Sequence, residues 1–172
     1  MTGPSRRGAD SPANVLFLCT FNASRSIMAE AILNHLGQGR FRAHSAGDQA
    51  VGKIHPLTFE VLARHGVPTT GLRSKTWEYF FGLAAPQLDF LIIVCDDSCE
   101  DLVWPSEGQL IRAYWATPNP TENKSADEDA MRSAFEAVYA SLERRIRAFL
   151  DLPLHELTTT EQWRAVKQIG EI

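Results

Sequence analysis

The chain has 172 residues, a length that suits a single domain with a sizeable hydrophobic core. Hydrophobic residues make up 44% of the chain and charged residues 22%, as in ordinary globular proteins. The net charge of −4 without a basic run argues against a nucleic-acid partner, and the lack of any run of ~18 apolar residues argues against a membrane span or membrane partner.

The first residues of the chain are polar. They include Arg6 and Arg7 but no apolar segment of the kind found in signal peptides, so we predict a disordered lead-in over residues 1–13 and one domain over residues 14–172. The three cysteines show no pairing pattern, which fits a reducing, cytoplasmic location better than a secreted one.

A strand, a polar loop and a helix follow one another directly after the lead-in. Residues 15–18 form a short apolar run, typical of a buried strand. The loop begins with Cys19 and ends with Arg25, and from Ser26 the apolar residues have helical spacing until Gly37 ends the pattern. This arrangement directs backbone N–H groups and a helix dipole at an anion.

The middle of the chain continues the alternation of strands and helices. Residues 41–45 predict a second short strand, and residues 57–65 predict a helix that Pro56 opens. Ser74 is expected to cap a further helix that reaches toward Phe81.

The second half of the chain completes the predicted sheet. Residues 88–95 form the most apolar strand and residues 110–115 a fourth one. A long helix capped by Ser125 and a tail helix over residues 161–169 follow. Because strands alternate with helices and no linker or repeat is visible, we predict a single-domain α/β fold: a four-stranded parallel sheet with helices on both faces.

The loop between strand and helix carries residues suited to nucleophilic chemistry on an oxyanion. A nucleophilic sulfur must be a thiolate, and a helix N-terminus and a guanidinium both favour that form of Cys19. Arg25 can bind two oxygens of a tetrahedral anion, and Ser26 can donate a hydrogen bond to the sulfur. The other loop residues expected to bind the anion, mostly small or polar, are Thr20, Phe21, Asn22, Ala23 and Ser24.

Two alternatives remain open at this point. A Cys-x5-Arg spacing also occurs by chance, and a cysteine at a strand end is often a small buried hydrophobe. Ser45, at the end of the neighbouring strand, either braces the anion loop or belongs to a simple strand-end turn.

Motifs along the chain resemble one family. Residues 14–34 are similar to the anion loop and first helix of low-molecular-weight protein tyrosine phosphatases, and more closely to the arsenate reductases built on that fold. The resemblance runs to the C-terminus and implies flavodoxin-like layering of the sheet and thiol chemistry on arsenate or phosphate. The other motifs that carry it, of which the last two are typical of the arsenate reductase branch, are Arg40-Phe-Arg-Ala-His-Ser-Ala-Gly47, His55-Pro56, Gly71-Leu-Arg-Ser-Lys75, Val94-Cys-Asp96, Trp104-Pro105, Leu152-Pro-Leu and Ile169-Gly170.

The resemblance also implies roles for the cysteines. Cys19 would attack arsenate, and a second thiol would then attack that sulfur, releasing arsenite and forming a disulfide. Cys95 matches the resolving position of one branch, whereas Cys99 has no exact counterpart and an outside thiol is an alternative. Cys95 is equally well explained as a buried strand-end residue. No bound cofactor or metal is implied; glutathione with glutaredoxin, or thioredoxin, would supply the electrons.

One departure from the family concerns the general acid. Relatives place an Asp in the loop after the last strand, where it protonates the leaving group; this chain has Asn119 there. Loss of general acid catalysis typically costs ~100- to 10,000-fold and should hinder phosphate ester hydrolysis most. Asp127 and Asp129 are candidate substitutes, although carboxylates are common at helix starts. The sequence therefore favours arsenate reduction, with a phosphatase or a degenerate oxyanion-binding protein as alternatives.

Overall fold

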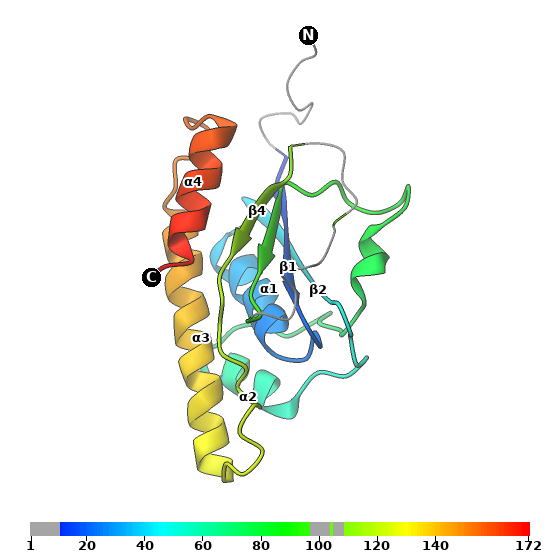
Figure 1. Cartoon of the computed structure of the whole chain (residues 1–172), viewed down its shortest axis with the longest axis vertical. Coiled ribbons are helices and arrows are strands. Elements are labelled where there is room, and N and C mark those ends of the chain that lie inside the picture. The colour runs from blue at the N-terminus through cyan, green and yellow to red at the C-terminus, as the bar shows by residue number, and fades with distance from the viewer. Residues whose placement is uncertain (1–10, 97–103, 105–108) are drawn as a thin grey trace.

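The computed structural model describes residues 11–96, 104 and 109–172. Its centre is a parallel sheet of four strands in the order β2-β1-β3-β4, as Figure 1 shows. The strands are β1 (Ala13–Cys19), β2 (Phe41–Gly47), β3 (Phe90–Ile93) and β4 (Ile111–Tyr114). The predicted α/β fold with a four-stranded parallel sheet is confirmed.

The central strand β1 explains the position of the site. Its residues from Val15 to Leu18 are fully buried because both faces of the sheet are covered, so the strand is continuously apolar instead of alternating. The chain adds β2 on one side of β1 and then β3 on the other. Such a switch point leaves a crevice at the carboxyl ends of the strands, where ligands bind in open parallel sheets. Cys19 is the last residue of β1.

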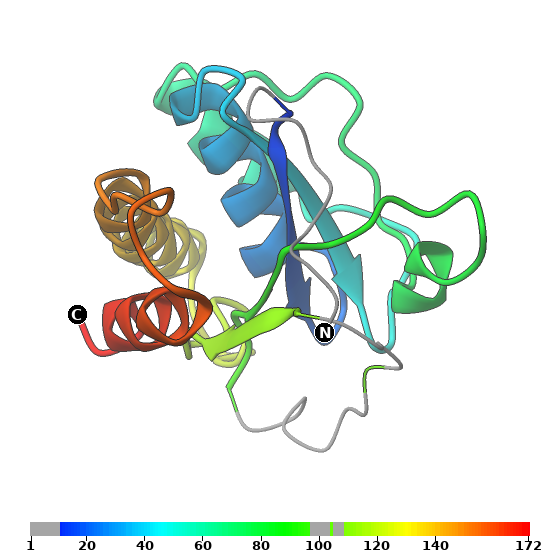
Figure 2. The same ribbon diagram turned by 90° about the horizontal axis from the view of Figure 1, so that it is seen from above.

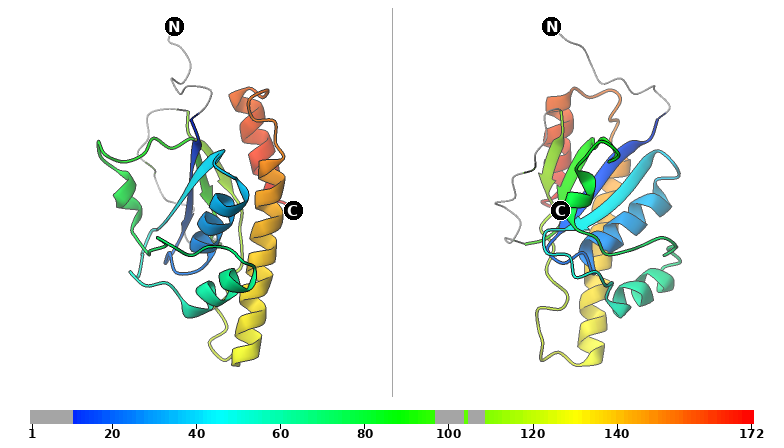
Figure 3. Two further views of the ribbon diagram at one scale, coloured as in Figure 1. Left: turned by 180° about the vertical axis from the view of Figure 1, so that it is seen from behind. Right: turned by 90° about the vertical axis from the view of Figure 1, so that its right-hand side faces the viewer.

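One face of the sheet is covered by the helices α1 (Arg25–Leu36), α3 (Glu128–Leu150) and α4 (Thr159–Ile169). The helix α2 (Pro56–Arg64) packs against α1 and α3. Figure 2 shows α1, α3 and α4 on the same side of the strands, and Figure 3 shows α3 running along the length of the domain. Phe149 of α3 anchors this side, because its ring lies 4.9 Å from that of Phe41 and 5.2 Å from that of Phe90.

The opposite face carries the 3₁₀ helix η1 (Trp77–Phe80). His44, on β2, packs its ring against Phe80 at 5.5 Å, whereas its neighbour Ser45 bonds Glu30 of α1. Successive residues of β2 thus point to opposite faces, of which α-helices cover one and the 3₁₀ helix η1 covers the other. Trp104 closes this side with ring contacts to Trp77 and Phe81.

Several predicted boundaries need correction. Ser74 does not cap a helix; its hydroxyl accepts from the N–H of Gly52. Ser125 is not the cap of α3 either, because the carboxylate of Asp127 accepts from the N–H of Ala130 at 2.8 Å. Polar residues cluster before both helices, so sequence alone does not identify the one that caps.

The ends of the chain add two observations. β1 begins at Ala13, inside the predicted lead-in, and residues 1–10 of that lead-in lie outside the described residues. Within the described ranges, no helix combines the length and apolar character needed to cross a membrane.

The half-buried imidazole of His44 predicts a pH-dependent stability. Burial first, and then the charges of Lys75 and Arg42, lower its pKa from 6.5 to about 4. The unfolded chain therefore binds a proton near pH 5 that the folded chain does not, so the free energy of unfolding should fall as the pH falls from about 6.5 toward 4.

Urea unfolding at pH 7 and pH 5 measures this loss. His44→Gln should reduce the difference between the two pH values, whereas the same change at the exposed His35 should leave it intact. An equal pH dependence in the parent and in His44→Gln would contradict the assignment.

Candidate active site

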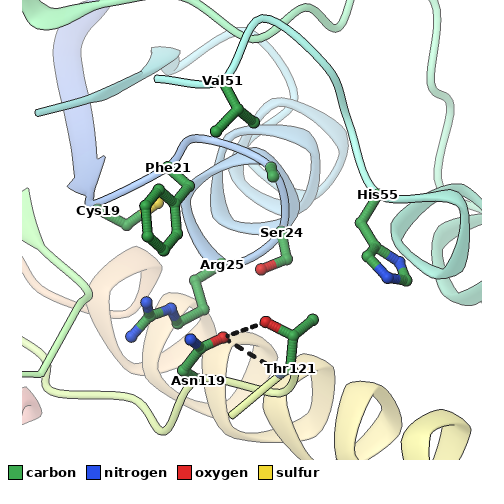
Figure 4. A pocket seen from close by; sticks show the side chains of 9 residues that line it. Cys19, Phe21, Ser24, Arg25, Val51, His55, Asn119 and Thr121 are labelled. Atoms are coloured by element: carbon green, nitrogen blue, oxygen red, sulfur yellow. Dashed lines mark hydrogen bonds between the residues drawn. The ribbon is translucent and has the colours of Figure 1, made fainter. Parts of the chain in front are cut away.

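The predicted strand, loop and helix surround a cavity at the carboxyl end of β1. The cavity has a volume of about 230 Å³, and Cys19 at its base is 2% exposed and forms no disulfide. Figure 4 shows the side chains around it. The lining residues, which come from the loop, from the segment before α2 and from the segment after β4, are Cys19, Phe21, Ala23, Ser24, Arg25, Val51, His55, Asn119 and Thr121.

The backbone of the loop after Cys19 is held from outside. Four of its carbonyl groups accept N–H groups from the segment after β2. Because the C=O and N–H of a planar peptide point in opposite directions, the loop's own N–H groups turn to its inner side, toward the cavity. The four bonds are Asp48 N to Cys19 O (3.1 Å), Gln49 N to Thr20 O (2.8 Å), Val51 N to Phe21 O (3.2 Å) and His55 N to Ala23 O (2.9 Å).

The start of α1 differs from that of the other α-helices. Side chains cap α2, α3 and α4, through His55, Asp127 and Thr158 respectively. At α1 the N-cap residue Ser24 makes no capping bond, and the first turn contains no acidic residue. The positive end of this helix is thus left for an anion in the cavity.

A chain of hydrogen bonds fixes the sulfur of Cys19. The Asn22 amide nitrogen donates to the Ser26 hydroxyl at 2.8 Å, and that hydroxyl lies 2.8 Å from Cys19 Sγ. The Ser26 oxygen accepts from Asn22, and its own hydrogen can be donated to the sulfur. Asn22 has a φ of 47°, a left-handed conformation that Asn tolerates, and its side-chain oxygen accepts from the N–H of Lys75.

The loop packs closely on the end of β2. A Cβ atom at Gly47 would lie 2.8 Å from the Thr20 carbonyl oxygen and 2.9 Å from the Asn22 nitrogen. Only glycine lets these backbones approach so closely, so position 47 sets how near the loop lies to the sheet.

A partly buried ion pair joins α1 to the segment before η1. Ser45 does not reach the cavity; it is fully buried and donates to Glu30, whose carboxylate lies 3.6 Å from Lys75 Nζ. Burial raises the pKa of Glu30 and lowers that of Lys75, so each charge depends on the other for compensation. Ser45 therefore braces this ion pair, and the structure does not bring it to the position of an anion ligand.

Arg25 is the buried cation of the site. It is 3% exposed, and its Nη1 donates to the Thr117 carbonyl at 3.0 Å and lies 3.5 Å from the Asp96 carboxylate. Its Nε is buried and has no hydrogen-bond partner among the described residues. The side chain is therefore fixed at one nitrogen and keeps another donor for a ligand.

Asn119 faces the cavity from the segment after β4. Its side-chain oxygen accepts from both the N–H (3.1 Å) and the hydroxyl (2.9 Å) of Thr121. The amide nitrogen is the opposite end of the group and lies on the side of Arg25 (Figure 4). Asn119 can thus donate a hydrogen bond but cannot supply a proton. The candidate substitutes Asp127, which caps α3, and Asp129, which lies 3.8 Å from Arg132, do not line the cavity.

The other cysteines are placed less completely. Cys95 is buried two residues beyond β3, the strand that pairs with β1, so the two cysteines lie at neighbouring strand ends. Cys99 lies outside the described residues.

Several residues of the site were not predicted from the sequence. Val51, His55 and Thr121 line the cavity, and Thr117 holds Arg25. His55 caps α2 through Nδ1, directly before the Pro56 that was predicted to open this helix, and burial lowers the pKa of His55. Accepting at Nδ1 leaves the proton of a neutral imidazole on Nε2.

The geometry defines a thiol and guanidinium site at the carboxyl edge of a parallel sheet, and comparison with known proteins identifies its family. The family model of the low molecular weight phosphotyrosine protein phosphatases matches residues 14–162. The chain belongs to this family of enzymes, in agreement with the resemblance seen in its motifs.

Individual relatives include arsenate reductases. One from Shouchella clausii is 23% identical over 137 residues, covering 80% of this chain and 94% of that protein. A glutaredoxin arsenate reductase from Synechocystis is 31% identical over 81 residues, covering 47% of this chain and 59% of that protein. The crystal structure of an arsenate reductase from Archaeoglobus fulgidus has a TM-score of 0.57 at 26% identity, covering 77% of this chain and 98% of that one.

The bond between Ser26 and the sulfur gives a direct prediction. Ser26→Ala removes the donor to Cys19, so alkylation of Cys19 by iodoacetamide at neutral pH should slow by about 10- to 100-fold, the loss of one hydrogen bond to a charged group. Ser133→Ala, an exposed change on α3, is the control and should leave the rate unchanged. An unchanged rate in Ser26→Ala would mean that the hydroxyl does not stabilise the thiolate.

Proposed function

We propose that the protein is a thiol-dependent arsenate reductase. The Cys19 thiolate attacks the arsenic of arsenate bound in the loop, one arsenate oxygen leaves as water after taking up protons, and a sulfur–arsenic bond forms. A second thiolate then attacks Cys19 Sγ. The sulfur–arsenic electron pair passes to arsenic, which leaves as arsenite, and the two thiols are oxidised to a disulfide.

One observation carries the proposal: Cys19 lines one cavity at the uncapped start of α1 together with Arg25, whose buried Nε has no hydrogen-bond partner among the described residues. A tetrahedral oxyanion in that cavity would meet the guanidinium, the inward amides of the loop and the helix dipole together. The guanidinium, the loop amides and the helix dipole all favour binding of a dianion next to the Cys19 sulfur. The loop residues from Thr20 to Ser24 would surround this anion.

The second thiol is the less defined part of the reaction. Cys95 is the internal candidate, because it follows the strand that pairs with β1. Glutathione with glutaredoxin, or thioredoxin, is the proposed electron donor. The similarity to a protein named glutaredoxin arsenate reductase supports a donor of this class.

Asn119 favours arsenate over a phosphate ester as substrate. As an amide donor it can bind an oxygen of the anion, but it cannot protonate a poor leaving group such as an alkoxide. Arsenate oxygens exchange more easily, and water or the anion itself can supply the proton. The phosphatase activity for which the family is named is the second candidate function.

The first test is loss of the nucleophile. Arsenate-dependent oxidation of thiols, measured as arsenite release, should disappear in Cys19→Ser. A serine hydroxyl is not ionised at neutral pH and cannot form a disulfide. Turnover that persists in Cys19→Ser would overturn the proposal. Cys95→Ser is the companion variant: lost turnover with unchanged Cys19 alkylation would identify Cys95 as the resolving thiol.

The second test separates reductase from phosphatase. Asn119→Asp restores a general acid and should raise hydrolysis of an aryl phosphate by ~100- to 10,000-fold over a slow parent. The control is Asn123→Asp, the same chemical change at an exposed position of the same segment. A parent that already hydrolyses aryl phosphate rapidly would favour phosphatase function. A parent that binds phosphate but neither reduces arsenate nor hydrolyses esters would be an oxyanion-binding protein only.

A further inference from the structure

A second buried arginine lies behind the site. Arg145, on α3, is 7% exposed and does not line the cavity. Its guanidinium donates to two segments at once. Nη1 contacts Trp115 O (3.0 Å), Ala116 O (3.1 Å) and Thr117 Oγ1 (3.1 Å), while Nε contacts Ile172 O (3.1 Å) and Nη2 contacts Gly170 O (3.2 Å). Arg145 therefore ties the segment after β4 to the segment after α4.

Thr117 connects this arginine to the site. It is buried, its hydroxyl accepts from Arg145 and donates to the Trp115 carbonyl at 2.8 Å. Its own carbonyl accepts from Nη1 of Arg25. The backbone that Arg145 holds is thus the backbone that orients the anion-facing guanidinium.

We propose that Arg145 is a positioning residue for Arg25. It fixes the peptide groups of residues 115–117, so that the Thr117 carbonyl holds Nη1 of Arg25 and leaves Nε directed at the cavity. The inference rests on the proposed function, because it assumes that Arg25 binds the substrate oxyanion.

The choice of residue at 145 supports this role. Only a guanidinium presents five N–H donors in a rigid fork, which is what the acceptors on the two segments require; a lysine ammonium has one nitrogen and cannot span both. Burial, and then the neighbouring charge of Arg144, lower the pKa of Arg145, and the carbonyl groups around its guanidinium offset the cost of burying that charge.

Protection of Cys19 by inorganic phosphate tests the proposal. In Arg145→Lys, the phosphate concentration that halves the rate of alkylation by iodoacetamide should rise about tenfold, the loss expected when one charge-assisted hydrogen bond to the anion is misdirected. The alkylation rate without phosphate should change much less, because Arg25 keeps its charge in the site and the Ser26 hydroxyl, which contacts the sulfur and accepts from Asn22, does not depend on Arg145. A general structural defect would change both rates. Arg144→Lys is the matched control on the exposed side of α3 and should change neither.

A double-mutant cycle shows whether the effect passes through Arg25. In an Arg25→Lys background, where the clamp is already lost, Arg145→Lys should weaken phosphate protection no further. An equal additional weakening in that background would overturn the positioning role, and so would unchanged protection in Arg145→Lys alone.

A second pair of variants decides the matter if Arg145→Lys does not fold. Thr117→Val removes the hydroxyl that accepts from Arg145 but keeps the carbonyl that holds Arg25, whereas Thr117→Ser keeps both. Weakened protection in Thr117→Val with normal protection in Thr117→Ser supports the proposal, and equal protection in the two overturns it. If phosphate does not protect the parent protein, the proposed function itself fails, which is distinguishable from a failure of the positioning role alone.

Discussion

The site depends on how one permanently charged guanidinium is buried. Removing such a charge from water is costly unless acceptors surround it. Arg25 has acceptors at Nη1, namely the Thr117 carbonyl and the Asp96 carboxylate, but Nε has none among the described residues. The side chain is therefore held at Nη1, while Nε keeps an unused donor in a residue that lines the cavity. An anion bound in the cavity would offset the remaining cost of burying the Arg25 charge, because it would accept a hydrogen bond that no described residue accepts.

The parallel sheet is what gathers the required groups. Because all four strands point the same way, their carboxyl ends lie at one edge, and each neighbouring strand supplies a part. β1 ends in Cys19, the proposed nucleophile, the segment after β3 supplies Asp96, and the segment after β4 supplies Thr117 and Asn119. The helix that follows β1 then adds its N-terminus. None of these groups needs a long loop to reach the others.

The parts of the site that could be predicted from the sequence are local. Cys19, Asn22, Arg25 and Ser26 lie within one loop and the first turn of one helix, so their types and spacing already define a nest with a nucleophile. The spacing of apolar residues likewise predicted the strands and the long helices, because that spacing reflects which faces of each element are buried. The sequence left the role of Ser45 open, because the pattern at the end of a strand does not show which face of the sheet the last side chains point to. In the structure Ser45 bonds Glu30 and does not line the cavity.

The unpredicted parts depend on contacts between distant segments. Lys75 reaches Asn22 across 53 residues, and Arg145 reaches Thr117 across 28. Thr121 belongs to the site because its hydroxyl donates to the side-chain oxygen of Asn119 and so fixes the orientation of that amide. Such pairs carry no periodic signal, and polar residues near helix starts are too numerous for sequence to select the one that caps.

The open start of α1 has a consequence for selectivity. Amide donors, a helix dipole and a guanidinium recognise the charge and tetrahedral shape of an anion, and phosphate and arsenate share both. A binding site made of these groups should therefore bind phosphate and arsenate with similar affinity. In the reaction proposed here, discrimination would fall to chemistry after binding: phosphate would occupy the site and depart intact, and only the anion whose central atom accepts an electron pair would be consumed.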